Sequence, residues 1–277
     1  MGAFICPVCR GILRNTGDSY VCCNNHSFDI AKSGYVNLLL SKHIGKTVHG
    51  DNKLMVAARR DFLDKGYYSK LREMVCEIVK SYYHGGLLLD SGCGEGYYTE
   101  AISDIIESSN IAGNIIGLDI SKIAVDFAAK RCKKARFAAA SCFHMPIADS
   151  SCSMIVTMFA PYSGSEFQRV LHKNGTLLMV IPSTDHLWDM KQKIYDIPYK
   201  NKVKSYELEG FKLVENKRLT YNICLEKQAD IWSLFTMTPY FYRTGKEQQE
   251  RLAALDKLET TVDFEVLVYR VTAKIDI

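Results

Sequence analysis

The sequence contains no apolar run of the roughly 18 residues that a membrane-spanning helix requires, and its start does not resemble a secretion signal. We therefore expect a cytoplasmic protein without a membrane span. Internal repeats and low-complexity tracts are also missing. With 47% hydrophobic and 24% charged residues, the 277-residue chain has the composition of a folded globular protein, which argues against disordered, collagen-like and coiled-coil architectures.

Cysteine, in contrast, is frequent, and positive charge is unevenly distributed. Ten cysteines in a cytoplasmic chain are expected to be thiols or metal ligands rather than disulfides. The net charge of +4 is too small to indicate a nucleic-acid partner. However, the first 60 residues hold eight Lys/Arg against three Asp/Glu. An anionic partner and an ordinary solvated basic surface explain this asymmetry equally well.

The chain divides into three segments. Residues 1–35 are rich in cysteine and turns, and they contain no stretch that would build a hydrophobic core of its own. Residues 36–85 form a connector with expected helices at 53–63 and 68–83. Residues 86–277 form the third and largest segment.

From Leu87 onward, short apolar strands alternate with helical stretches. After the strand at Leu87, we expect strands at 114–120, 136–139, 153–158 and 175–181, and helices at 97–107, 122–131, 166–171 and 186–194. This alternation predicts a parallel sheet with crossover helices, a doubly wound α/β domain. Beyond residue 199 the pattern predicts strands at 211–218 and 262–271 and helices at 227–235 and 246–258.

A metal-binding spacing occurs in the first segment. The motif Cys6-x2-Cys9-x12-Cys22-x3-His26 places two ligand pairs at the two ends of a hairpin-length loop, which is typical of tetrahedral structural zinc. Cys23 adjoins Cys22 and competes for the same position; we favour Cys22 with His26. Four protein ligands leave no open position for water, so this site is predicted to be structural. The alternative is a set of unligated thiols beside a surface histidine.

A glycine-dense turn follows the strand at Leu87. Asp90 ends the strand, Gly92, Gly94 and Gly96 follow it, and Asp119 ends the next strand. Glycines allow a ligand to approach the backbone, and a carboxylate at the second strand end accepts ribose hydroxyls. The sequence therefore predicts a site for a nucleoside-like ligand, although an inert tight turn is an alternative.

The acids distinguish between possible ligands. No Lys-Ser or Lys-Thr follows the glycines, which argues against a P-loop. The spacing of the three glycines is G-x-G-x-G rather than the dinucleotide pattern G-x-G-x-x-G, and Asp90 would repel a pyrophosphate. Both observations argue against a dinucleotide. S-adenosylmethionine carries a sulfonium, an ammonium and a ribose, so it fits both acids. The motif therefore favours a methyltransferase cofactor.

Both motifs, in this order, resemble the RlmA-type methyltransferases that modify N1 of a guanine in 23S ribosomal RNA. The resemblance extends over nearly the whole chain, and it also includes segments 28–32, 34–39, 58–60, 62–63, 90–99, 160–161 and 237–239. This chain departs from the family at Phe159, where tyrosine is common, and at Ser141-Cys142-Phe143-His144, where the histidine is displaced by one residue. Both departures bear on target-site choice.

The resemblance implies a Rossmann-like S-adenosylmethionine-dependent methyltransferase domain with a small N-terminal zinc-binding domain. It implies one structural zinc ion on Cys6, Cys9, Cys22 and His26, and cofactor contacts from Tyr68, Gly94, Glu95 and His186. To these the strand-end pattern adds Asp90, Gly92 and Asp119. The substrate would be a 23S ribosomal RNA hairpin loop, and the family implies a homodimer.

Methylation of guanine N1 also requires an accessible base and a proton acceptor. Water, a main-chain carbonyl at Ala160-Pro161 and His144 are candidate acceptors, and the sequence singles out none of them. Four aromatic residues are candidates for stacking on the base or are core residues: Tyr97, Tyr98, Phe159 and Tyr162. Five basic residues would contact phosphates or form a solvated face: Lys42, Lys46, Lys53, Arg59 and Arg60.

Two other functions remain open from the sequence. One is a zinc-containing methyltransferase that acts on another RNA or on a small molecule. The other is a non-catalytic RNA-binding module, although the intact Asp90, Gly92, Gly94 and Asp119 argue against it. A labelled methyl donor supplied with RNA, with ribosomal subunits or with small metabolites would separate them.

Overall fold

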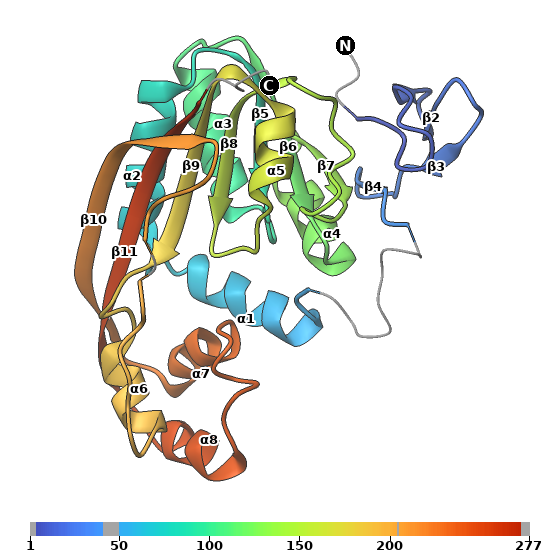
Figure 1. Ribbon diagram of the computed structural model, residues 1–277. Helices are drawn as coiled ribbons and strands as arrows, with labels where there is room; N and C mark the ends of the chain where they lie inside the picture. Colours follow the sequence, from blue (N-terminus) through green and yellow to red (C-terminus); the bar gives the residue numbers. More distant parts are fainter. Residues whose placement is uncertain (1–3, 41–49, 204, 273–277) are drawn as a thin grey trace.

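The computed structural model describes residues 4–40, 50–203 and 205–272 (Figure 1). Within these ranges the chain forms a three-stranded sheet and an eight-stranded sheet. The small sheet consists of β1 (Arg14–Asn15), β2 (Ser19–Val21) and β3 (Ser27–Asp29). The large sheet has the strand order β10-β11-β9-β8-β5-β6-β7-β4.

The centre of the large sheet is parallel. Its parallel strands are β4 (Val36–Asn37), β5 (Gly86–Ser91), β6 (Gly113–Asp119), β7 (Arg136–Ala139), β8 (Cys152–Met158) and β9 (Leu171–Pro182). Both faces are buried, because Leu88 of β5 enters one hydrophobic cluster whereas Leu87 and Leu89 enter another. Burial on both faces explains the nearly continuous apolar runs in the sequence.

Crossover helices connect these strands, as the alternation in the sequence predicts. Helices α2 (Ser69–Tyr82) and α3 (Tyr97–Ser108) pack on the cluster that contains Leu88, and α4 (Lys122–Arg131) packs on β6 and β7. Helix α5 (Gly164–Val170) contributes to the cluster on the opposite face. The predicted α/β, Rossmann-like fold class is confirmed.

The C-terminal part differs from the prediction. Strand β10 (Phe211–Leu225) continues beyond residue 218, strand β11 (Leu258–Val271) begins before residue 262, and helix α8 (Lys246–Ala253) ends before residue 258. The physical reason is a long antiparallel pairing, in which Phe211 lies opposite Val271 and Leu225 lies opposite Leu258. Backbone hydrogen bonds to a distant strand therefore decide these boundaries rather than local helical spacing.

Four helices lie at the carboxyl end of the parallel strands: α1 (Lys53–Leu63), α6 (Trp188–Ile194), α7 (Gln228–Thr236) and α8. Figure 1 shows α1 below the ends of β8 and β9, with α7 beyond it. Helix α1 packs against both α7 and α4. Among the helices in the described ranges, none has both the length and the apolar character needed to cross a membrane.

The small sheet is attached to the edge of the large one. Phe4 forms a β-bridge with Ile147, and the Ile5 N–H donates to the Pro146 carbonyl at 2.9 Å. Buried side chains of the small sheet and of the large sheet belong to one hydrophobic cluster. We propose the division into residues 1–35, 36–85 and 86–277, with β4 as the part of the connector that joins the large sheet.

Candidate functional site

The glycine-rich turn lies between β5 and α3, and its glycines have different packing environments. All three have positive φ: 84° at Gly92, 55° at Gly94 and 88° at Gly96. A Cβ on Gly92 would lie 2.4 Å from the Ala160 Cβ, and one on Gly96 would lie 3.0 Å from the Ala128 Cα. These two glycines therefore permit close packing of the chain. A Cβ on Gly94 would lie 3.7 Å from the Arg59 Nη1, which is the nearest atom, so at this glycine the space beside the backbone is bounded by a side chain rather than by another backbone segment.

Three carboxylates surround this turn: Asp90 and Glu95 are buried, and Asp119 is partly buried. Asp90 accepts a hydrogen bond from the Thr99 hydroxyl at 2.6 Å, and burial raises the pKa of Asp90 to about 7. Asp119 accepts from the Gly94 N–H at 3.0 Å and from the Ser121 N–H at 2.8 Å. Burial also raises the pKa of Asp119 and that of Glu95. Glu95 is 2% exposed, and its Oε1 has no hydrogen-bond partner among the described residues.

These carboxylates fit S-adenosylmethionine. A buried carboxylate oxygen without a partner is costly unless a ligand compensates it, and Glu95, next to Gly94, supplies such an oxygen. Each oxygen of Asp119 keeps a further lone pair for a ribose hydroxyl, since it accepts one backbone N–H only. The negative charge of the three acids matches a cofactor with a sulfonium and an ammonium.

Tyr68 and His186 lie in a neighbouring aromatic cluster. The Tyr68 and Phe264 rings are 5.2 Å apart, and the His186 and Phe264 rings are 4.8 Å apart. The Phe159 ring is 5.5 Å from the same Phe264 ring. Since Ala160 follows Phe159 and packs against Gly92, the cluster adjoins the glycine-rich turn.

His186 is a buried neutral ring rather than a base. Burial lowers its pKa to about 3, so the ring is neutral at physiological pH. Its Nδ1 accepts the Asp263 N–H at 3.3 Å, which leaves the proton of the neutral ring on Nε2. His186 can therefore donate to a ligand through Nε2. His144, one of the candidate proton acceptors, lies in the loop after β7, where it lines a cavity of about 220 Å³ together with Cys6 and Arg10.

The four aromatic candidates separate into two pairs. Tyr97 is 2% exposed, and the Tyr98 hydroxyl is buried, so both belong to the core. Phe159 and Tyr162 are 45% and 41% exposed. Phe159 also has a φ of 55°, an uncommon conformation for a bulky residue and one that is often found at functional sites.

The expected phosphate-binding face is only partly present. Arg59 forms an ion pair with Asp51 beside the glycine-rich turn, so a phosphate contact from this residue stays a prediction. The Arg60 guanidinium lies 4.2 Å from the centre of the Phe127 ring, and Lys53 is exposed. Lys42 and Lys46 lie outside the described residues.

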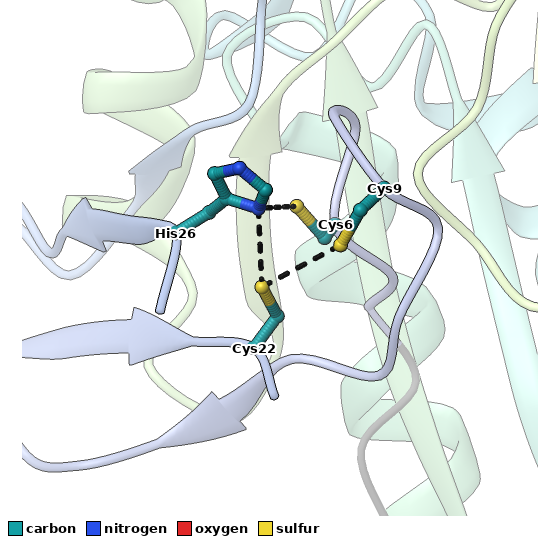
Figure 2. Close-up of side chains that lie close together, drawn as sticks. All are labelled: Cys6, Cys9, Cys22 and His26. Carbon is teal, nitrogen blue, oxygen red and sulfur yellow. Dashed lines mark hydrogen bonds between the residues drawn. The ribbon is translucent and has the colours of Figure 1, made fainter. Parts of the chain in front are cut away.

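The zinc motif forms a compact cluster in the N-terminal segment. Figure 2 shows Cys6, Cys9, Cys22 and His26 pointing toward one another, and their ligand atoms all lie within 4.8 Å of each other. Cys6 and Cys9 come from the turn before β1, whereas Cys22 and His26 flank the turn between β2 and β3. Each turn contains a residue with positive φ, Arg10 at 62° and Asn25 at 60°.

The spacing within this cluster fits zinc. The Cys9 and Cys22 sulfurs are 3.6 Å apart, and the His26 Nδ1 is 3.6 Å from the Cys6 sulfur and 3.3 Å from the Cys22 sulfur. Zinc–sulfur and zinc–nitrogen bonds of about 2.3 and 2.0 Å place tetrahedral ligand atoms roughly 3.5–3.8 Å apart. Cys23 is exposed and is not part of the group, which favours Cys22 as the ligand.

Two further contacts were not expected from the sequence. Thr99 stabilises Asp90, and its position within the glycine-rich segment was the available signal. Phe264 joins Tyr68, Phe159 and His186, but it comes from β11, far along the chain. No local pattern indicates such a contact.

Comparison with known proteins gives matches to both parts of the chain. The RlmA N-terminal zinc-ribbon family matches residues 4–43, and a methyltransferase domain family matches residues 88–178. The protein named "Putative 23S rRNA (guanine-N(1)-)-methyltransferase YxjB" of Bacillus subtilis (strain 168) is 30% identical over 275 residues, which is 96% of each chain. The "23S rRNA (guanine(748)-N(1))-methyltransferase" of Streptomyces fradiae is 34% identical over 189 residues, covering 67% of this chain and 65% of that protein.

A solved structure of a "putative methyltransferase" from Bacillus halodurans C-125 is also similar. It has a TM-score of 0.50 and 15% sequence identity, and the match covers 72% of this chain and 98% of that one. At this identity the similarity supports the fold alone.

Proposed function

Because this chain belongs to the RlmA-type 23S rRNA (guanine-N1)-methyltransferase family, we propose that it transfers a methyl group from S-adenosylmethionine to N1 of a guanine in a 23S rRNA hairpin loop. The observation that carries the proposal is the joint presence of the zinc cluster and of the carboxylate-lined turn, in the family's order. The chain is thus an S-adenosylmethionine-dependent methyltransferase with a zinc ribbon.

The residues of the turn would bind and orient the cofactor. S-adenosylmethionine, when bound, supplies an electrophilic methyl group on a sulfonium. We propose that Asp119 binds the ribose and that Asp90, Glu95 and the Gly92–Gly94 backbone bind the methionine part. Tyr68 and His186 would contact the cofactor from the neighbouring aromatic cluster. Holding both reactants in line would supply much of the rate enhancement, about 7–11 kcal/mol for a well-oriented pair.

The zinc ribbon would act in recognition or stability rather than in chemistry. Three thiolates and one imidazole complete a tetrahedron, so no position remains for a substrate. We propose Cys6, Cys9, Cys22 and His26 as the ligands. The Gly11 backbone hydrogen bond lowers the pKa of Cys9 to about 6, which favours the thiolate that a metal requires.

The test is methylation with labelled S-adenosylmethionine and three separate acceptors: protein-free 23S rRNA, assembled large subunits and a small-metabolite extract. We expect label in RNA, together with a reverse-transcription stop at one guanine, because a methyl group on N1 blocks base pairing. Label confined to the metabolites would contradict the RNA substrate. RNA binding without any methyl transfer would indicate a non-catalytic module.

Phe159 is expected to stack on the target guanine. Replacement by alanine should lower kcat/KM for RNA about 5- to 150-fold, since base–aromatic stacking contributes about 1–3 kcal/mol. Steady-state methylation assays would measure this change. Phe159→Leu, which keeps an apolar side chain without the ring, should be similarly impaired, whereas Phe159→Tyr should retain activity. Full activity of the leucine variant would contradict stacking.

A further inference from the structure

Helix α1 brings a cation to the carboxylates of the glycine-rich turn. The segment before α1 is fixed to the end of β6, because the Ser121 hydroxyl donates to the Asp51 carbonyl at 2.7 Å. A Cβ on Gly50 would lie only 2.6 Å from the Ile120 Cγ2, so this packing is close. Arg59, two turns into α1, is thereby directed at the turn and lies next to Gly94.

Most N–H donors of the Arg59 guanidinium have no hydrogen-bond partner among the described residues. It forms an ion pair with Asp51, and among the described residues this is the only hydrogen bond that it makes. Burial lowers its pKa, but the charges of Asp51, Glu95 and Asp119 outweigh this effect and raise the pKa above its ordinary value. A guanidinium has five N–H donors, so most of them are available to a ligand.

The charges of the turn indicate which ligand group needs this cation. Asp90, Glu95 and Asp119 suit the sulfonium, the ammonium and the ribose of S-adenosylmethionine, but they would repel its α-carboxylate. The other cation that acts on Glu95 is Arg131, which already pairs with Asp64 at 2.7 Å and lies 3.9 Å from Glu100. Arg131 also donates one hydrogen bond only, but of these two arginines it is Arg59 whose guanidinium lies beside Gly94 of the turn.

We infer that Arg59 binds the α-carboxylate of S-adenosylmethionine, with Asp51 holding the guanidinium in place. This inference rests on the proposed function. It adds one positive group to the three acids of the site. The site thereby recognises both the ammonium and the carboxylate of the cofactor's methionine part. Planar guanidinium groups bind carboxylates through two parallel hydrogen bonds, which gives both affinity and orientation.

Calorimetric titration with S-adenosylmethionine and with its decarboxylated form tests the inference, since the two ligands differ only in the carboxylate. We expect Arg59→Gln to weaken binding of S-adenosylmethionine about 10- to 100-fold. Binding of the decarboxylated form should not become weaker. Arg60→Gln is the matched control, because Arg60 lies on the same helix but against Phe127; it should change neither affinity.

Equal weakening of both ligands by Arg59→Gln, or no weakening of either, would overturn the assignment. Thermal unfolding of each variant monitors the fold. Where the glutamine variant does not fold, Arg59→Lys replaces it; a lysine cannot form two parallel hydrogen bonds, so the preference for the carboxylated ligand should fall at least about threefold, and an unchanged preference would count against Arg59. A wild-type protein that binds neither ligand would contradict the proposed function itself.

Discussion

Replacing Cys9 by alanine is expected to abolish stoichiometric zinc binding and to unfold the N-terminal ribbon. The ribbon has only short strands, and structural zinc contributes about 10–16 kcal/mol in comparable peptides. The α/β domain should persist, because one of its two main clusters contains no ribbon residue and most of the other comes from residues outside the ribbon. Metal analysis, near-UV circular dichroism and RNA-binding assays would show the loss, while affinity for S-adenosylmethionine should stay within about threefold because the sites are distinct.

Cys23→Ala is the matched control for this experiment. Cys23 is an exposed thiol beside Cys22, and it lies outside the ligand cluster. The variant should keep one zinc ion per chain and a native spectrum. Removal of zinc from the wild type with a chelator should reproduce the Cys9 result. A Cys9→Ala protein with full zinc content and a native near-UV spectrum would refute the structural role of the metal.

Replacing Asp119 by alanine is expected to weaken binding of S-adenosylmethionine by about 100-fold or more. The carboxylate holds the Gly94 and Ser121 N–H groups, so its removal leaves two backbone donors without their partner and disorders the turn. It also removes the proposed acceptor for the ribose hydroxyls. Isothermal titration calorimetry measures the effect directly and without RNA.

The control for Asp119 is Asp126→Ala. Asp126 lies on α4, the helix that follows Asp119, and it pairs with Lys130 at the protein surface. Its loss should leave the affinity unchanged. Wild-type affinity in the Asp119 variant would show that this carboxylate does not bind the cofactor. It would also contradict the interpretation of the carboxylates at the two strand ends as a cofactor site.

Much of the candidate site could be predicted because its members are close in the sequence. Cys6 with Cys9, and Cys22 with His26, each belong to one tight turn, so their spacing fixes how their ligand atoms converge. Asp90 and the three glycines form one strand end and one turn. Asp119 ends the neighbouring parallel strand, and carboxyl ends of parallel strands meet at one edge.

Other features could not be predicted, because side-chain direction depends on distant partners. Arg59 belongs to a basic segment, yet it pairs with Asp51 beside the glycine-rich turn. The sequence left Tyr97 open between base stacking and the core, and the packing of α3 buries it. Neither outcome has a local signal, since each is decided by elements that are separate in the chain.

The α/β fold class, the zinc cluster and the acidic glycine-rich turn follow from the order of the amino acids, because strand periodicity and short ligand spacings are properties of local chain geometry. The extent of β10 and β11, the exposure of Phe159 and the direction of Arg59 follow from the folded arrangement instead. Each of these depends on contacts between segments far apart in the chain, where burial and charge pairing outweigh local preference.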